Sequence, residues 1–345
     1  MLVASVHDPD VFCLEQRDKL YCAYVLEHAR KMAFCHVPII CEALRSGLDS
    51  AIKALPSDVR GFMEEALKRK VELEPEAAAI ECVRKDTVLL GQQSACVALR
   101  NVDAIDAVVT TKSVEDVVLR AYPEDDKVRT FENYSGTPAW RKEKDAFGFK
   151  PIGRMDNEDV LARFVTPFVR WATKLVLIDP YVSKTFAGAR RDPRDKKNKG
   201  HWGQFARTIK AVYGSWHQAR NELQLPQDVL EIRTVCVDDE DPKDLAKGIW
   251  QGIGAESGVE VVVLDYRSIR NINHDRFLVS NNNTVLTVSR GFDLFREEGV
   301  SAACTVSLGN TKTEERDTIN KLLISSEIAR YPVRNIASLA DAWPK

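Results

Sequence analysis

The stretch DAIDAVVTTKSVEDVVLRAY, residues 103 to 122, decides the fold class. Its apolar run predicts a buried strand, TTKS predicts a polar turn, and the following valines and leucine recur at helical spacing. The same succession of strand, turn and helix recurs along the chain. The sequence therefore predicts an α/β fold in which mainly parallel or mixed sheets are flanked by helices.

The rest of the first half of the chain shows the same alternation of strands and helices. MAFCHVPIICEALRSGL, residues 32 to 48, predicts a strand, a break at the proline and a helix. We also expect an opening strand at 1–6, helices at 15–31, 56–69 and 87–100, and an edge strand at 125–134.

The periodicity fails in SGTPAWRKEKDAFGFKPIGR, which gathers glycine, proline and mixed charge. We expect a first domain at 1–134, a connection at 135–155, a second domain at 156–325 and a C-terminal tail at 326–345. In the second half we expect helices at 156–172 and 202–222, a basic loop at 188–201, and strands at 173–182, 230–237 and 259–266.

Composition excludes several classes of protein. A chain of 345 residues with 44% hydrophobic residues is long enough for two packed domains. The formal net charge of −2 argues against a protein that coats nucleic acid over its whole surface. The 8 cysteines stand singly, without a C-x-x-C pair, which predicts neither a zinc site nor a disulfide framework and favours a reducing cytoplasm. No window approaches 18 uninterrupted apolar residues, so we expect no membrane span.

Acidic residues follow several of the expected strands or open the helices after them. Carboxylates that meet at one edge of a parallel sheet can hold Mg²⁺ or Mn²⁺ and activate water. Each acid also has an alternative role as a helix cap or first-turn carboxylate. The candidate ligands are Asp8, Asp10, Glu42, Asp86, Glu115 and Asp116.

The order of these acids resembles the PIN domain family of ribonucleases over residues 1–134, and DAVVTTKSVEDV carries most of the likeness. The resemblance implies Mg²⁺- or Mn²⁺-dependent RNA cleavage by Asp8, Glu42, Asp86 and Asp116. The sequence departs from the family at Lys112, where many members have an acid or asparagine. That lysine could neutralise the site, or its role could pass to Glu115 or Asp116.

A second signature is NHDRFLVSNNNTVLTVSRGFDLF, residues 273 to 295. Phospholipase-D-type enzymes use H-x-K-x(4)-D, in which histidine attacks phosphorus and lysine holds the phosphoryl oxygens. Here the run is His274, Arg276 and Asn281, in a single copy. Hydrolysis by His274 would require two copies to meet across a dimer, and we expect a fold that keeps the shape of this site without its chemistry.

Residues 175–308 resemble the phospholipase-D-like C-terminal domain found behind MIT domains, on the strength of IDPYV and of this signature. The sequence departs at Ser289, where that family tends to have glycine. The resemblance implies a non-enzymatic role, with acidic phospholipid binding and dimer formation. An alternative role for His274, Asp275, Arg290 and Asp293 is a buried polar network. Residues that could bind a phosphate-bearing ligand are His274, Arg276, Arg290, Lys196 and Lys197.

The other motifs of the sequence indicate no further function. The sequence lacks a P-loop, a dinucleotide-binding glycine pattern and a zincin motif. His28 and His36 stand near three cysteines in apolar surroundings that favour packing. Trp202, beside the basic stretch, is the tryptophan most suited to a binding role.

Two functions remain open. One is a metal-dependent ribonuclease-like effector of a microbial defence or toxin system, in which a degenerate phospholipase-D-like domain senses a ligand. The other is a non-catalytic adaptor for phosphate-bearing ligands, lipid headgroups or a protein. RNA, a protein partner and a second copy of the chain are the expected partners.

Overall fold

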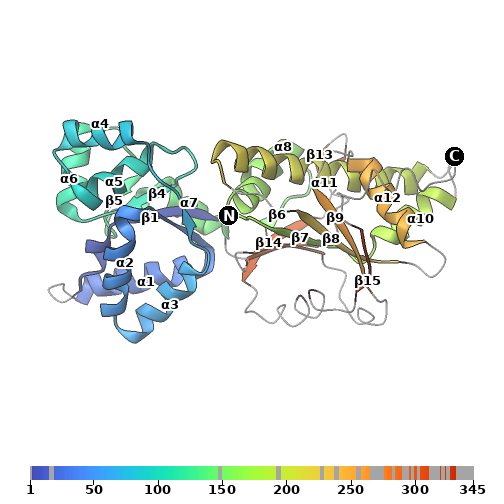
Figure 1. Ribbon diagram of the computed structural model, residues 1–345, viewed down its shortest axis with the longest axis horizontal. Coiled ribbons are helices and arrows are strands. Elements are labelled where there is room, and N and C mark those ends of the chain that lie inside the picture. Colours follow the sequence, from blue (N-terminus) through green and yellow to red (C-terminus); the bar gives the residue numbers. More distant parts are fainter. Residues whose placement is uncertain are drawn as a thin grey trace. The chain divides into compact units, whose positions relative to one another are not determined.

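The computed structural model (Figure 1) divides by its contacts into two compact units, Met1–Phe147 and Gly148–Lys345, and each is described by itself. The structure describes residues 2–14, 19–146, 150–191, 196–225, 229–236, 241–253, 258–264, 276–281, 284–289, 295–296, 299–300, 304–310, 319, 323 and 327–331. The α/β class expected from the sequence is confirmed. No helix in these ranges has the length and apolar character needed to cross a membrane.

The first unit contains a sheet in which all strand pairs of the described residues are parallel. The strand order is β3-β2-β1-β4-β5. Every residue of β1 and β2 is buried, as expected when helices cover both faces of a parallel sheet. The strands are β1 (Val3–His7), β2 (His36–Ile40), β3 (Val71–Glu72), β4 (Ala107–Val109) and β5 (Val128–Arg129).

Helices flank this sheet on two sides. In Figure 1, α4 and α6 lie above the strands and α1 and α3 lie below them. Buried apolar side chains such as Val3, Met32 and Phe131 form the core. The helical segments are η1 (Pro9–Phe12), α1 (Lys19–Cys35), α2 (Glu42–Ala54), α3 (Ser57–Leu67), α4 (Ala77–Thr87), α5 (Gly91–Ala98), η2 (Leu99–Asn101), α6 (Lys112–Ala121), η3 (Tyr134–Gly136) and α7 (Pro138–Ala146).

A buried polar network runs through this core. The His36 ring bonds the Ser5 hydroxyl at 2.9 Å through Nδ1 and the Glu143 carboxylate at 2.8 Å through Nε2. A third hydrogen bond joins Nε2 of His7 to Nε2 of His28 at 3.0 Å. His28 and His36, for which the sequence favoured packing, are therefore core residues. Their hydrogen bonds connect α1, β1, β2 and α7.

The second unit contains a mixed sheet in the order β15-β9-β8-β7-β10-β11-β14-β6. Its strands β7, β8 and β9 are parallel and its other pairs are antiparallel. The strands of this unit are β6 (Lys150–Pro151), β7 (Leu175–Ile178), β8 (Leu230–Val235), β9 (Val259–Leu264), β10 (Arg276–Ser280), β11 (Thr284–Val288), β14 (Thr305–Asn310), β15 (Glu327–Tyr331) and the separate pair β12 (Phe295–Arg296) and β13 (Gly299–Val300).

Helices α8, α10, α11 and α12 lie on one side of these strands in Figure 1. Trp202 stacks with Phe205 and contacts Phe186, which places it in helix packing. The helical segments are α8 (Asn157–Val160), the π-helix η4 (Leu161–Val165), α9 (Thr166–Val169), α10 (Val182–Arg191), α11 (Lys196–Glu222) and α12 (Pro242–Ile253).

Three local expectations are corrected. Pro38 does not break the second strand but lies within β2. Proline is tolerated there because β3 pairs with Ile39 and Ile40 and not with Pro38. Helix α4 was not expected, because only Val83 and Thr87 of it are buried and its apolar signal is weak. The basic stretch expected as a loop is largely helical, at the end of α10 and the start of α11, since lysine and arginine are good helix formers.

Regular structure also occupies parts of the chain expected to have none. Helix α7 lies within the expected connection, and its Glu143 bonds His36 of the first unit. Strand β6, in the same stretch, pairs with β14 of the second unit. Strand β15 lies at the start of the expected C-terminal tail and pairs with β9.

Candidate site at the carboxyl edge of the first sheet

The first sheet reverses its strand order between β1 and β4. After β1 the chain builds the sheet outward through β2 and β3, and it then returns to the other side of β1 with β4 and β5. In open α/β sheets, ligands bind outside the carboxyl ends of the strands at such a reversal. His7 of β1 is level with Val109 of β4, so Asp8 and Thr110 come next to each other at this edge.

Asp8 is buried at the edge. Its Oδ2 accepts a hydrogen bond from the Thr110 hydroxyl at 3.1 Å, and its Oδ1 accepts one from the Asp10 backbone N–H at 3.2 Å. Burial raises the pKa of Asp8, and the neighbouring Asp10 charge adds to that increase. No cationic side chain of the described residues forms an ion pair with either acid. A buried carboxylate beside a second carboxylate is costly unless a proton or a cation neutralises it.

Asp10 is held by two side-chain amides. Gln92 Nε2 lies 3.3 Å from Asp10 Oδ1, and Gln93 Nε2 lies 3.4 Å from Oδ2. Both glutamines are in the first turn of α5. Rotation of either amide by 180° would present an oxygen instead of N–H. A Cβ on Gly47 of α2 would lie 2.9 Å from Gln92 Oε1 and 3.0 Å from Cγ of Pro9, so any larger residue there would have to displace the Gln92 amide.

The two acids after β4 are occupied by the lysine that departs from the PIN pattern. Lys112 Nζ lies 3.0 Å from Glu115 Oε2 and 2.9 Å from Asp116 Oδ1, and these bonds raise the pKa of Lys112. Glu115 is buried and also accepts two hydrogen bonds from the Asn133 amide, at 3.0 and 2.8 Å. These contacts join α6 to the segment after β5.

The remaining predicted acids, Glu42 and Asp86, are exposed and share no hydrogen-bond partner with Asp8. Glu42 follows β2 at the same edge as Asp8, because Val6 of β1 is level with Ile39 of β2. Glu42 is exposed at the start of α2, and its backbone N–H donates to Glu74 Oε1 at 2.6 Å. Asp86 is exposed on α4 and accepts a hydrogen bond from the Tyr122 hydroxyl at 2.5 Å. Tyr122 follows the last residue of α6, whereas Lys112 is its first, about 15 Å away along the helix. Asp86 therefore lies near the end of α6 opposite to Glu115.

The described residues contain no group of three or more histidine, cysteine, aspartate or glutamate side chains that could hold a metal ion. Asp8 and Asp10 are two carboxylates with neutral oxygens nearby, from Thr110, Gln92 and Gln93. Mg²⁺ is commonly bound by one or two carboxylates with water and substrate phosphate completing its shell. The edge therefore fits a partly solvated divalent ion, and not an all-protein metal cage.

Sequence reasoning missed Thr110, Gln92, Gln93 and Asn133, the neutral side chains of this edge. Their only signal was position: Thr110 follows the AVV strand directly, and the two glutamines open a helix.

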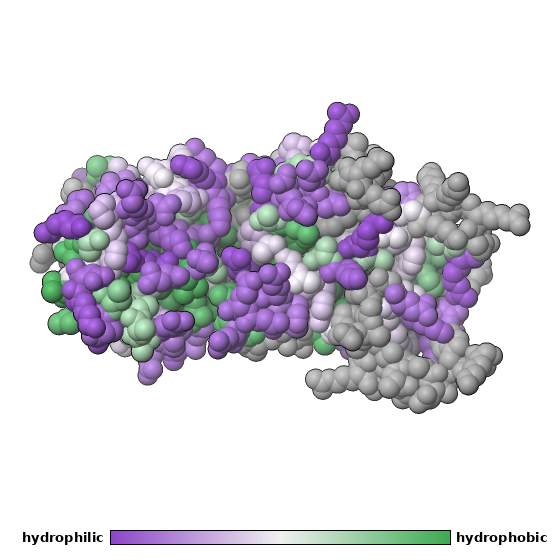
Figure 2. Space-filling view, turned by 90° about the horizontal axis from the view of Figure 1, so that it is seen from above, coloured by the Kyte–Doolittle hydropathy of each residue, from purple (hydrophilic) through white to green (hydrophobic). Residues whose placement is uncertain are grey.

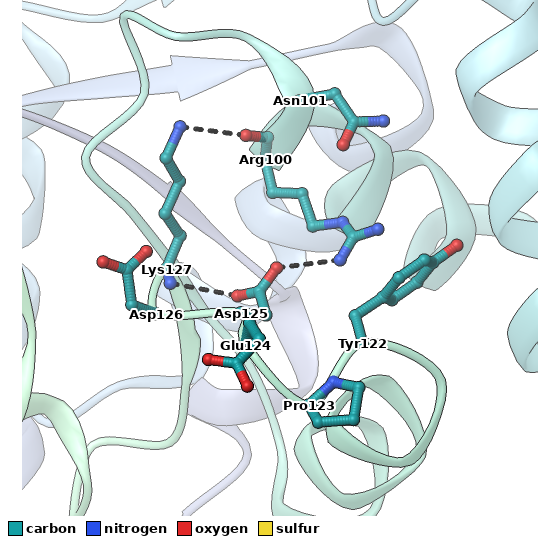
Figure 3. A pocket seen from close by; sticks show the side chains of 8 residues that line it. All are labelled: Arg100, Asn101, Tyr122, Pro123, Glu124, Asp125, Asp126 and Lys127. Atoms are coloured by element: carbon teal, nitrogen blue, oxygen red, sulfur yellow. Dashed lines mark hydrogen bonds and ion pairs between the residues drawn. The ribbon is translucent and has the colours of Figure 1, made fainter.

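A pocket of about 500 Å³ lies at the amino ends of β4 and β5, on the other edge of the same sheet (Figure 3). The Arg100 guanidinium pairs with Asp125 at 2.8 Å and lies 3.5 Å from the centroid of the Tyr122 ring. The second Asp125 oxygen accepts hydrogen bonds from the backbone N–H groups of Lys127 and Val128. Because the charges of Arg100 and Asp125 already neutralise each other, we assign the pocket no function.

In the second unit, only part of the predicted phosphate site can be placed. Arg276 opens β10 and pairs with Asp179, of the IDPYV stretch, at 3.3 Å from Nε to Oδ1. Its guanidinium lies 4.4 Å from the centroid of the Tyr181 ring. Lys196 and Lys197 are the first residues of α11. His274 and Arg290 lie outside the described residues.

No protein-family model matches the chain, and no curated protein matches it.

Proposed function

We propose that the protein is a metal-dependent ribonuclease-like effector whose first unit hydrolyses RNA at the carboxyl edge of its parallel sheet. The observation that carries this proposal is the pair Asp8 and Asp10, which meet at the reversal of strand order without a cation among the described residues. A divalent ion and a phosphate would complete that arrangement. The resemblance of this part of the chain to PIN-type ribonucleases supports it further.

The roles of the chain's own residues follow from their contacts. Asp8 would hold the ion through a carboxylate that Thr110 orients, and Asp10 would hold it through a carboxylate that the two glutamines fix. A bound Mg²⁺ or Mn²⁺ would supply an activated water and polarise the scissile phosphate. The N-terminus of α6 lies at the same edge and would bring partial positive charge to the substrate.

The test is cleavage of labelled single-stranded RNA by the purified full-length chain. We expect cleavage in Mn²⁺ or Mg²⁺, no cleavage in EDTA, and loss of cleavage in Asp8→Asn, which keeps the shape of the side chain but removes its charge. Asp49→Asn is the matched control, because Asp49 is an exposed acid of α2 away from the edge. Cleavage that survives in Asp8→Asn, or that needs no divalent ion, would refute the proposal.

A second candidate is a non-catalytic adaptor. A cytoplasmic location is favoured by the cysteines, which form no disulfide among the described residues. The observation that supports the adaptor is Lys112, which already neutralises both acids after β4. In this alternative the second unit binds a phosphate-bearing ligand or a protein through Arg276. It predicts no Mn²⁺ binding at Asp8 and a loss of ligand affinity in Arg276→Ala.

A further inference from the structure

The turn that joins α4 to α5, residues Thr87 to Gly91, departs from local conformational preferences at two positions. Val88 ends α4 with φ of 57°, in the left-handed region where glycine or asparagine is usual and a β-branched residue is an outlier. Leu90 is the N-cap of α5 and makes no side-chain cap hydrogen bond, although serine, threonine, aspartate or asparagine normally stands there. Other residues at both positions would stabilise the fold.

The same two side chains are largely exposed. Val88 is 82% exposed and Leu90 is 70% exposed, and among the described large hydrophobic residues only Leu20, at 62%, is comparable. Figure 2 shows such hydrophobic side chains, in green, scattered among hydrophilic ones on the left of the view, where the first unit lies. Local strain combined with exposed apolar surface is typical of residues kept for a contact with another molecule.

A positively charged residue lies close to Val88 and Leu90 in the chain. Arg84 is one helical turn before Val88, whose N–H donates to the Arg84 carbonyl at 3.1 Å, so both residues lie at the last turn of α4. Arg84 is exposed and forms no ion pair with a described residue. The neighbouring Lys85, in contrast, pairs with Glu81 at 3.6 Å.

The turn also borders the candidate site. Gln92 and Gln93, which hold Asp10, follow directly after Gly91. Leu90 is two residues before Gln92, which limits their Cα separation to about 7 Å. A strand of nucleic acid with its phosphate at Asp10 would therefore pass this turn.

We infer that Arg84, Val88 and Leu90 bind one unpaired nucleotide of single-stranded RNA next to the phosphate at Asp10. The aliphatic side chains pack on the face of the base and the guanidinium binds a backbone phosphate, which is how proteins hold single strands without reading sequence. This inference rests on the proposed function for the identity of the substrate. Two side chains supply far less surface than the roughly 800 Å² per partner of a stable protein interface, so a nucleotide fits better than a protein.

The test measures binding separately from cleavage, by fluorescence anisotropy of the full-length chain with a labelled single-stranded RNA in EDTA. The double variant Val88→Asn and Leu90→Ser should lower affinity about fivefold. It should also melt at a higher temperature than the wild type, since asparagine suits the left-handed conformation and serine caps a helix. Arg84→Ala should reduce the slope of log affinity against log salt concentration by about 0.7.

Leu20→Ser is the matched control, because it removes an equally exposed aliphatic side chain from α1 and should leave affinity unchanged. Any of four results would overturn the inference: no binding by the wild type, unchanged affinity in the double variant, the same loss in Leu20→Ser, or a lower melting temperature in the double variant. Analytical sedimentation tests whether the turn instead binds a second copy of the chain. Self-association of the wild type that is lost in the double variant would overturn the inference in favour of that dimer. Normal binding without cleavage would instead refute only the proposed function.

Discussion

At the scale of single residues, the charge balance of the carboxyl edge depends on which acids have a cation. Asp8 and Asp10 have none among the described residues, whereas Glu115 and Asp116 share Lys112. The sequence was sufficient to name these acids and to identify Lys112 as the departure from the PIN pattern. It could not predict the amide clamp, because glutamines give no charge signal and Gln92 is 82 positions away from Asp10.

Lys112→Met should strengthen Mn²⁺ binding. Loss of the ammonium frees one buried and one half-exposed carboxylate, and because Lys112 is 63% exposed we expect a modest gain in affinity, of about fivefold. Isothermal titration with MnCl₂ would measure it. Lys53→Met, which removes a surface lysine of α2, should have no effect. Unchanged or weaker binding in Lys112→Met would show that Glu115 and Asp116 do not contribute to the ion's site.

At the scale of elements, the strand and helix predicted from residues 103 to 122 are confirmed as β4 and α6. Their apolar spacing is regular and their turn is polar, so local pattern and tertiary packing agree. The basic stretch at 188–201 was predicted wrongly because its charge density was taken as a loop signal. The two ends of this stretch instead belong to α10 and α11. These helices pack against each other through Phe186 and Trp202, whose ring centroids are 4.9 Å apart.

The crossing of α10 and α12 depends on one glycine. A Cβ on Gly248 of α12 would lie 2.1 Å from Cε2 of Phe186 and 2.5 Å from its Cζ. Gly248→Ala should therefore destabilise the protein by roughly 1–3 kcal/mol, through overpacking. Urea denaturation would measure this change.

Gly214→Ala is the control for that substitution. Gly214 lies within α11 with no atom within 4 Å of the added Cβ, so alanine should stabilise the protein by up to about 1 kcal/mol. Equal effects of the two substitutions would contradict the close approach of α10 and α12.

At the scale of the whole molecule, the sequence predicted the α/β class but not the order of the strands. Strand order depends on which side of β1 the chain returns to after β3, and this is a tertiary choice without a local signal. The place of α7 was missed for a similar reason. Its Glu143 bonds His36 from 107 positions away, and mixed charge in that stretch favoured a loop.

The buried network makes the first unit sensitive to acid. Burial and the nearby His36 charge lower the pKa of His7 from 6.5 to about 3. Burial alone would raise the pKa of Glu143, but the hydrogen bond and charge of His36 outweigh it and hold it at about 2. Both groups bind protons more tightly in the unfolded chain. The contribution of His7 is complete above pH 6.5 and falls between pH 6.5 and about 3, whereas that of Glu143 is complete above pH 4.5 and falls between pH 4.5 and about 2. Each falls by up to about 1.4 kcal/mol per pH unit for each proton taken up.

Hydrogen exchange of peptides from α1, β2 and α7, followed by mass spectrometry, would measure this effect. We expect protection to fall steadily from pH 7 to pH 5 once the exchange rates are corrected for the intrinsic effect of pH. His28→Gln should flatten the dependence, because burial also holds the pKa of His28 well below 6.5. His217→Gln, which removes an exposed histidine of α11, should not. Protection that stays constant over this range would argue against neutral, buried histidines.

The central claim is that Asp8 and Asp10 form a divalent-ion site at the reversal of strand order. Anomalous diffraction at the manganese edge from crystals of the full-length chain soaked in MnCl₂ tests it most directly. We predict a peak within about 2.5 Å of carboxylate oxygens of both residues, absent in Asp8→Asn. Absence of a peak at this edge in the wild type, or a peak only at Glu42, Glu74 or Asp86, would contradict the claim.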